Sequence, residues 1–201
     1  HYHADHISGL QGFKEHAGSP PVWAQRQALG YAGGTAASQG EDSQRRLEQR
    51  REALFPWVDE HTYIVLPDET FESEKTFTVG GVTFKLKYLG PAHAPGDTVM
   101  LVQDYGVLFS GDVIYQGRVP FLDSPETNIE LWLKGLAALG ALEPPPRYVI
   151  PGHGTPSDEL AAAVALTEGY IAYVRDAMRT AVANFTPFDE AYSATDWSAY
   201  S

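Results

Sequence analysis

Cysteine is absent from this chain of 201 residues. Its absence excludes a disulfide-based scaffold, a metal site built from thiolates and a cysteine nucleophile. It does not indicate a compartment, because a protein without cysteine tolerates oxidising and reducing surroundings alike. Long apolar runs are also missing. No stretch approaches the roughly 18 consecutive apolar residues of a membrane-spanning helix, so we expect no membrane insertion.

Basic residues are scarce as well. The chain has 14 Lys and Arg against 26 Asp and Glu, which gives a formal net charge of −12. This balance disfavours nucleic acid and anionic membranes as partners, and it leaves room for bound cations. Hydrophobic residues make up 43% of the chain, an ordinary globular composition. We expect a single domain over residues 1–201, with 185–201 as a tail that packs against the body.

The pattern along the chain predicts alternating helices and strands. Apolar spacing predicts a short helix over 7–16, the Gly/Ala/Ser-rich segment 30–40 predicts a loop, and 41–55 predicts an exposed helix ended by Pro56. Two further helices are expected, over 129–142 and from an N-cap at Ser157 to about 184. The expected strands are 22–24, 63–66, 76–79, 82–86, 98–103, 107–109 and 148–150, with a Gly80-Gly81 hairpin turn.

Residue types that bind metals gather in four short motifs, which hold five of the seven histidines. Three of the motifs follow or end apolar strands, where side chains from different strands can meet at one sheet edge. His16 and His61 lack such a context, and we interpret both as surface residues. Imidazole and carboxylate are the ligands expected for zinc or iron. The motifs are His1-x-His3-x-Asp5-His6, the loop around His93 (90–97), the strand 108–112 ending in Asp112, and the strand 148–154 with His153.

The first motif begins at the first residue, with no strand, cap or targeting segment ahead of it. We interpret the chain as a sequence whose upstream part has been removed or is not shown. The lack of a signal peptide is then uninformative, and both periplasmic and cytoplasmic locations stay open.

The ordered set of motifs resembles the metallo-β-lactamase superfamily over residues 1 to about 156. The resemblance implies an α/β fold, the αβ/βα sandwich, here without the strands that precede the first motif. It also implies two zinc ions, with iron and manganese as alternatives. His1, His3 and His93 would hold one metal, and Asp5, His6 and His153 the other. Asp112 would bridge both, which gives Asp5 and Asp112 catalytic roles beside a bridging hydroxide.

The resemblance favours a hydrolase of small acyl substrates: esters, thioesters or lactones. Asp112 is typical of hydroxyacylglutathione hydrolases, and the segment 111–121 is similar to zinc metallohydrolases found beside sulfur-oxidation and quinoprotein systems. Three alternatives remain open. They are a persulfide dioxygenase with one iron on His3, His93 and Asp112, a β-lactam hydrolase, and a metal-binding domain without activity.

The substrate pocket is expected between 23–63, the loop after Asp112 and the last helix. Arg118 is the cation we select for a substrate carboxylate, because the guanidinium fork matches that group. A salt bridge from Arg118 to Asp123 or Glu126 is the competing interpretation. Aromatic residues at such positions belong to the core more often than to a pocket. The candidates for an aromatic pocket wall are Trp23, Tyr31, Trp57 and Tyr115.

Overall fold

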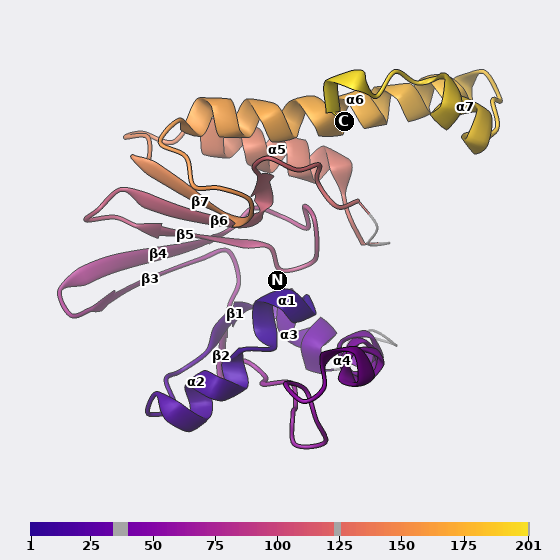
Figure 1. Cartoon of the computed structure of the whole chain (residues 1–201). Helices are drawn as coiled ribbons and strands as arrows, with labels where there is room; N and C mark the ends of the chain where they lie inside the picture. Colours follow the sequence, from indigo (N-terminus) through magenta and orange to yellow (C-terminus); the bar gives the residue numbers. More distant parts are fainter. Residues whose placement is uncertain (34–39, 123–125, 201) are drawn as a thin grey trace.

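The computed structural model describes residues 1–33, 40–122 and 126–200 and divides them into two layers (Figure 1). One layer contains a five-stranded sheet covered by two long helices. The other contains the N-terminal helices and a two-stranded parallel sheet. The first residue lies between the layers, at the edge of the larger sheet. This two-layer α/β arrangement is the predicted sandwich.

The larger sheet has the strand order β3-β4-β5-β6-β7. The first four strands are antiparallel neighbours, and β7 runs parallel to β6. Gly80 and Gly81 join β3 to β4 with φ angles of 58° and 82°, a left-handed turn that other residues rarely adopt, so the hairpin prediction is confirmed. The strands are β3 (Glu74–Val79), β4 (Val82–Tyr88), β5 (Thr98–Val102), β6 (Val107–Tyr115) and β7 (Tyr148–His153).

Two helices cover one face of this sheet and bury its core (Figure 1). They are α5 (Ile129–Gly140), which forms the crossover from β6 to β7, and α6 (Leu160–Ala183). Trp132 on α5 is fully buried and donates its indole N–H to the Val113 carbonyl at 2.9 Å. The indole therefore fixes α5 against β6 directly beside Asp112.

The second layer is smaller and N-terminal. Its strands β1 (Trp23–Gln25) and β2 (Glu69–Phe71) pair in parallel. The helices are α1 (Ala4–Ile7), α2 (Leu10–His16), α3 (Arg26–Gly33) and α4 (Gly40–Leu54). None of the helices in the described part of the chain has the length and apolar character needed to cross a membrane.

Several sequence-based boundaries are wrong. Residues 63–66 form no strand, because no strand in the described part of the chain pairs with them, and β2 lies further along. Residues 30–33 belong to α3 rather than to a loop, and 34–39 lie outside the described residues. The last helix begins at Leu160 with Glu159 as its N-cap, and the Ser157 hydroxyl instead accepts the Glu159 N–H.

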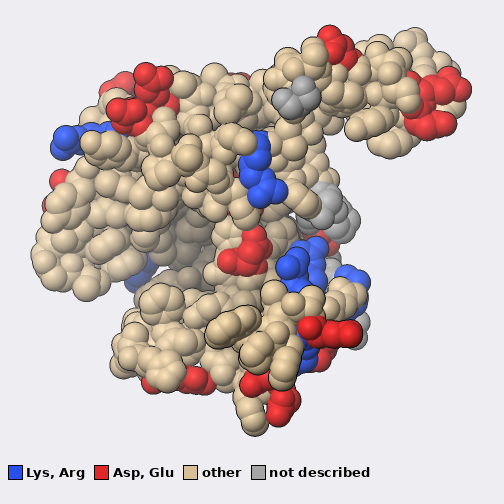
Figure 2. Space-filling model, in the orientation of Figure 1, with Lys and Arg blue, Asp and Glu red and all other residues tan. Residues whose placement is uncertain are grey.

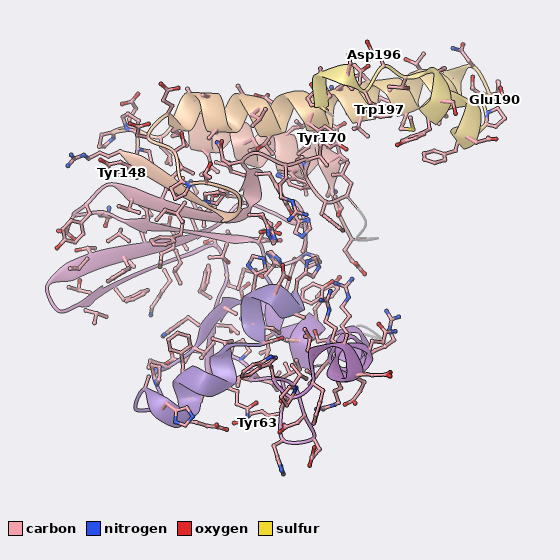
Figure 3. All side chains as sticks on the ribbon, in the orientation of Figure 1. Tyr63, Tyr148, Tyr170, Glu190, Asp196 and Trp197 are labelled. Carbon is pink, nitrogen blue, oxygen red and sulfur yellow. The ribbon has the colours of Figure 1, made fainter. Side chains whose placement is uncertain are left out.

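The tail folds against α6 through aromatic contacts. It contains α7 (Phe188–Ala194) and a 3₁₀ turn, Ser198–Tyr200, so it is more regular than its sequence pattern suggested. Trp197 packs against Tyr173 of α6, and Tyr200 packs against Tyr170 of the same helix. Figure 3 labels Trp197 and Tyr170. The C-terminal part of α6 and α7 extends past the sheet as an arm with acidic side chains at its far end (Figure 2).

Candidate metal centre

The structure brings all seven predicted residues into one cluster at the edge of the larger sheet. His1 and His3 precede α1, which carries Asp5 and His6, while His93 lies in the loop between β4 and β5. His153 is the last residue of β7. Asp112 lies inside β6 rather than at its end as predicted, in a stretch where the register with β7 shifts on both sides of the Gly111–Pro151 pair. Three groups have ligand atoms within 4.8 Å of one another: His1, His3 and His93; His1, His6 and Asp112; and Asp5, His6 and His153.

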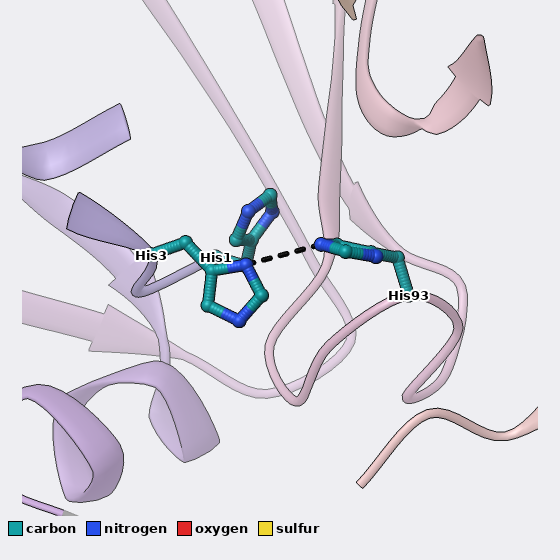
Figure 4. Close-up of side chains that lie close together, drawn as sticks. All are labelled: His1, His3 and His93. Atoms are coloured by element: carbon teal, nitrogen blue, oxygen red, sulfur yellow. Dashed lines mark hydrogen bonds between the residues drawn. The ribbon is translucent and has the colours of Figure 1, made fainter. Parts of the chain in front are cut away.

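The three rings of the first group lie close together (Figure 4), and their ligand nitrogens lie within 4.8 Å of one another. Nε2 of His93 lies 3.0 Å from Nδ1 of His3. Two nitrogens bound to one tetrahedral zinc at about 2.0–2.1 Å would lie about 3.3 Å apart, so this spacing suits a shared cation. Burial lowers the pKa of His3 to about 3, with the charges of His1, His93 and Arg46 acting in the same direction. The neutral imidazole that results is the form that binds metals.

Partners outside the cluster orient two rings of this group. Nδ1 of His1 lies 3.0 Å from Oδ1 of the fully buried Asp97, and Nδ1 of His93 lies 3.0 Å from the Phe121 carbonyl. Both rings thereby direct Nε2 inward. Burial opposes protonation of His1, but the Asp97 carboxylate outweighs it and raises the pKa of His1. Sequence reasoning missed Asp97, although it closes the same loop motif as His93.

Asp112 lies at the centre of the cluster. Its carboxylate oxygens lie 3.2 Å from Nε2 of His6, 3.4 Å from Nε2 of His153 and 3.6 Å from Nε2 of His93. Burial favours the neutral acid, yet the imidazoles of His6 and His1 and the Tyr115 hydroxyl together hold the pKa of Asp112 well below its usual range. Asp112 is therefore an anion buried among histidines.

Nε2 of His3 is one of four buried atoms of this cluster that have no hydrogen-bond partner. The other three are Nε2 of His1, Nε2 of His6 and Oδ1 of Asp112. These three belong to residues of one convergent group. Buried polar atoms without partners are costly, and a cation among these three would satisfy all of them. The donor set, imidazole and carboxylate, fits zinc.

The second group is more exposed. Oδ2 of Asp5 lies 3.1 Å from Nε2 of His153 and 3.6 Å from Nε2 of His6. Burial raises the pKa of Asp5, but the His6 charge and a backbone hydrogen bond outweigh it and the net pKa is lowered. Half of the Asp5 side chain is exposed, so this side of the cluster opens to a pocket.

That pocket has a volume of about 420 Å³. Arg118 lines it, as do Arg46 and Arg50 of α4, which sequence reasoning did not select. Of the two carboxylates considered as partners of Arg118, Asp123 lies outside the described residues. Within the described residues Arg118 contacts the Phe121 ring rather than Glu126.

Of the four aromatic candidates for a pocket wall, Tyr115 lines this pocket and the other three lie elsewhere. Tyr115 is buried and its hydroxyl donates to Oδ2 of Asp112 at 2.8 Å, so it holds the carboxylate in place. Trp23 lines a separate, mainly apolar cavity beside His1 and His6, with the Lys75 ammonium 4.2 Å from its ring centre. Tyr31 stacks on Tyr2, and Trp57 is 86% exposed beyond α4. His16 and His61 are exposed, as predicted.

Comparison with known proteins agrees with this geometry. The chain is 28% identical over 90 residues to the metallo-beta-lactamase type 2 of Bacteroides fragilis, covering 44% of this chain and 36% of that protein. It is 24% identical over 156 residues to hydroxyacylglutathione hydrolase GloC of Haemophilus influenzae, and this match covers 77% of this chain and 66% of that protein. The matched part of the chain thus spans less than two thirds of the length of either relative.

A solved metallo-beta-lactamase from Pontibacter korlensis has the same fold. Its TM-score is 0.61 at 19% identity, over 86% of this chain and 66% of that one. Residues 1–153 match the family described as the metallo-beta-lactamase superfamily, which is most of the chain and includes all seven clustered residues. The chain belongs to the metallo-beta-lactamase superfamily.

Proposed function

We propose that this protein is a hydrolase with two zinc ions that cleaves an ester, thioester, lactone or related acyl bond. His1, His3 and His93 would hold one ion, Asp5, His6 and His153 the other, and Asp112 would contact both. The observation that carries the proposal is the convergence of these residues around buried atoms that lack partners. The superfamily consists mostly of hydrolases, which supports an enzymatic role.

The residues of the chain would hold this centre in a fixed geometry. Asp97 and the Phe121 carbonyl fix two imidazoles, and the Tyr115 hydroxyl fixes Asp112. Zinc ions bound there would supply Lewis acidity and activate water. In the overall reaction, the oxygen of water bonds to the acyl carbon, the bond to the leaving oxygen or sulfur breaks, and the leaving group departs with a proton. No serine or cysteine nucleophile is required.

Metal analysis and a substrate panel test the proposal. Purified protein is expected to contain about two zinc per chain and to hydrolyse at least one member of a panel of thioesters, esters, lactones and a chromogenic β-lactam. Chelation should lower the rate more than about 100-fold, and added zinc should restore it. Full turnover without metal would overturn metal catalysis. One iron per chain with oxygen uptake would indicate a dioxygenase, and bound metal without any turnover would indicate a non-catalytic domain.

Asp97→Asn is expected to weaken the first metal site selectively. Asparagine keeps the shape but removes the charge that orients His1, and groups that hold a ligating histidine typically contribute 10–100-fold to metal affinity. Chelator competition should show about tenfold weaker binding of one zinc. Asp104→Asn is the matched control, since Asp104 accepts the Thr83 N–H at 2.6 Å in a turn away from the cluster. Equal zinc affinity in both variants would contradict the role of Asp97.

A further inference from the structure

Three arginines surround the pocket beside the candidate metal centre. Arg46 and Arg50 lie four residues apart on α4 and therefore share one helix face, and Arg118 follows β6 across the pocket. The same pocket is lined by His3, His93, Asp112 and His153. Lys and Arg side chains gather above α4 in the space-filling view, beside the boundary between the two layers (Figure 2). Positive charge is thus concentrated where the centre opens to solvent.

Four of the other arginines have carboxylate partners, whereas Arg147, which does not line this pocket, forms no ion pair among the described residues either. Arg26, Arg51, Arg175 and Arg179 each form an ion pair with a glutamate or aspartate. Arg46, Arg50 and Arg118 form no ion pair with any carboxylate among the described residues, in a chain with 26 acidic residues. The Arg118 guanidinium lies 5.7 Å from the centre of the Phe121 ring, which lines the same pocket. Like charges four residues apart on a helix repel, so an anion would relieve Arg46 and Arg50.

An anion from solution suits this pocket better than a neutral ligand. A net charge of −12 repels anions from most of the surface, so a local cluster of guanidinium groups focuses them onto one place. The guanidinium fork binds carboxylate and phosphate-like groups through two parallel hydrogen bonds. A volume of about 420 Å³ suits a small organic molecule rather than a polymer.

We propose that the substrate is an anionic acyl compound whose carboxylate or phosphate-like group is bound by Arg46, Arg50 and Arg118. The scissile carbonyl then faces the cluster around Asp112. This proposal rests on the proposed hydrolase function and names its substrate class.

Three thioesters of equal acyl length test the substrate class. The succinyl and 3-phosphonopropanoyl thioesters carry an anion at the distal end, and the butanoyl thioester is neutral there. The kcat/KM of at least one anionic thioester should exceed that of the butanoyl thioester by about tenfold or more at low salt, and the ratio should fall as salt is added. The anionic thioester with the higher kcat/KM shows whether the pocket prefers a carboxylate or a phosphonate group. Equal kcat/KM values for all three would overturn the proposal.

Substitution of the pocket arginines tests whether they cause the preference for anionic thioesters. Arg46→Met, Arg50→Met and Arg118→Met should each lower the ratio of anionic to neutral kcat/KM about tenfold. Arg45→Met is the matched control, because Arg45 is exposed on the same helix and does not line the pocket. An anionic preference that all three pocket variants retain would also overturn the proposal.

Calorimetry separates failure of this inference from failure of the hydrolase function. If no thioester is hydrolysed, binding of succinate and of 3-phosphonopropanoate to the zinc-loaded protein still reports on the pocket. Binding that the Arg46→Met variant weakens and the Arg45→Met variant keeps would support the anion site without hydrolysis. Binding of neither anion, or equal binding to all variants, would contradict it.

Discussion

Asp112→Ala is expected to abolish hydrolysis and to lower zinc content from about two to at most one per chain. Asp112 is the buried carboxylate that lies within 3.2–3.6 Å of three different imidazoles. Its removal leaves the histidines of both groups without the anion between them, and two cations would then repel each other without a shared partner. Groups that merely orient a ligand contribute 10–100-fold, so loss of this carboxylate should lower kcat/KM by more than about 100-fold.

Two further variants make this result specific. Asp158→Ala removes an exposed carboxylate ahead of α6 and should retain both zinc ions. Asp5→Ala should lower occupancy of the second site alone and leave partial activity that excess zinc restores in part, since mass action refills a weakened site. Zinc content by mass spectrometry and thioester hydrolysis are the two measurements. Full turnover of the Asp112→Ala variant with metal bound would reject a shared carboxylate.

Much of the candidate site was predictable because histidine and aspartate are recognisable as metal ligands from their side chains alone. Imidazoles and carboxylates in short motifs beside apolar strands indicate a metal site before any contact is known. The structure brings these seven residues together, and their binding of metal stays a prediction. The hairpin at Gly80-Gly81 was predictable for a similar reason, since its turn depends on local backbone preference alone.

What could not be predicted depends on tertiary placement. Asp97 and Tyr115 act through contacts with His1 and Asp112 that a linear pattern does not contain. Arg46 and Arg50 resemble the other charged residues of an exposed helix until the fold turns that face toward the pocket. The apolar run 63–66 has strand-like composition, but a strand also needs a partner, and none pairs with it in the described part of the chain.

Gly152→Ala is expected to disrupt the centre although it removes no candidate ligand. A Cβ at this position would overlap Oδ1 of Asp112 and would lie 2.9 Å from Cε1 of His6, closer than real Cβ contacts allow. Asp112 cannot rotate away freely, because the Tyr115 hydroxyl holds its other oxygen. We therefore expect loss of at least one zinc and a fall in unfolding free energy of about 1–3 kcal/mol, the usual cost of overpacking.

Gly12→Ala is the matched control for this substitution. No atom lies within 4 Å of the Cβ position at Gly12, which is in the interior of α2. Alanine is the better helix former by about 1 kcal/mol, so stability should stay equal or rise, with zinc content unchanged. Urea unfolding and zinc analysis of both variants check the prediction. A Gly152→Ala protein with two zinc ions and unaltered stability would show that β7 can move away from Asp112 at little cost.

The double variant Asp112→Ala/Gly152→Ala tests whether the clash acts through Asp112. If the new methyl group collides mainly with the carboxylate, removing the carboxylate makes room for it, and adding Gly152→Ala should cost less in the Asp112→Ala background than in the wild type. The two effects on unfolding free energy should then be non-additive by about 0.5–3 kcal/mol, measured in metal-free protein so that zinc does not contribute. The contacts of the new methyl group with His6 and with the Gly111 backbone remain in both backgrounds. Removing the Asp112 carboxylate should therefore relieve only part of the clash. Strict additivity would place the clash on those two neighbours instead.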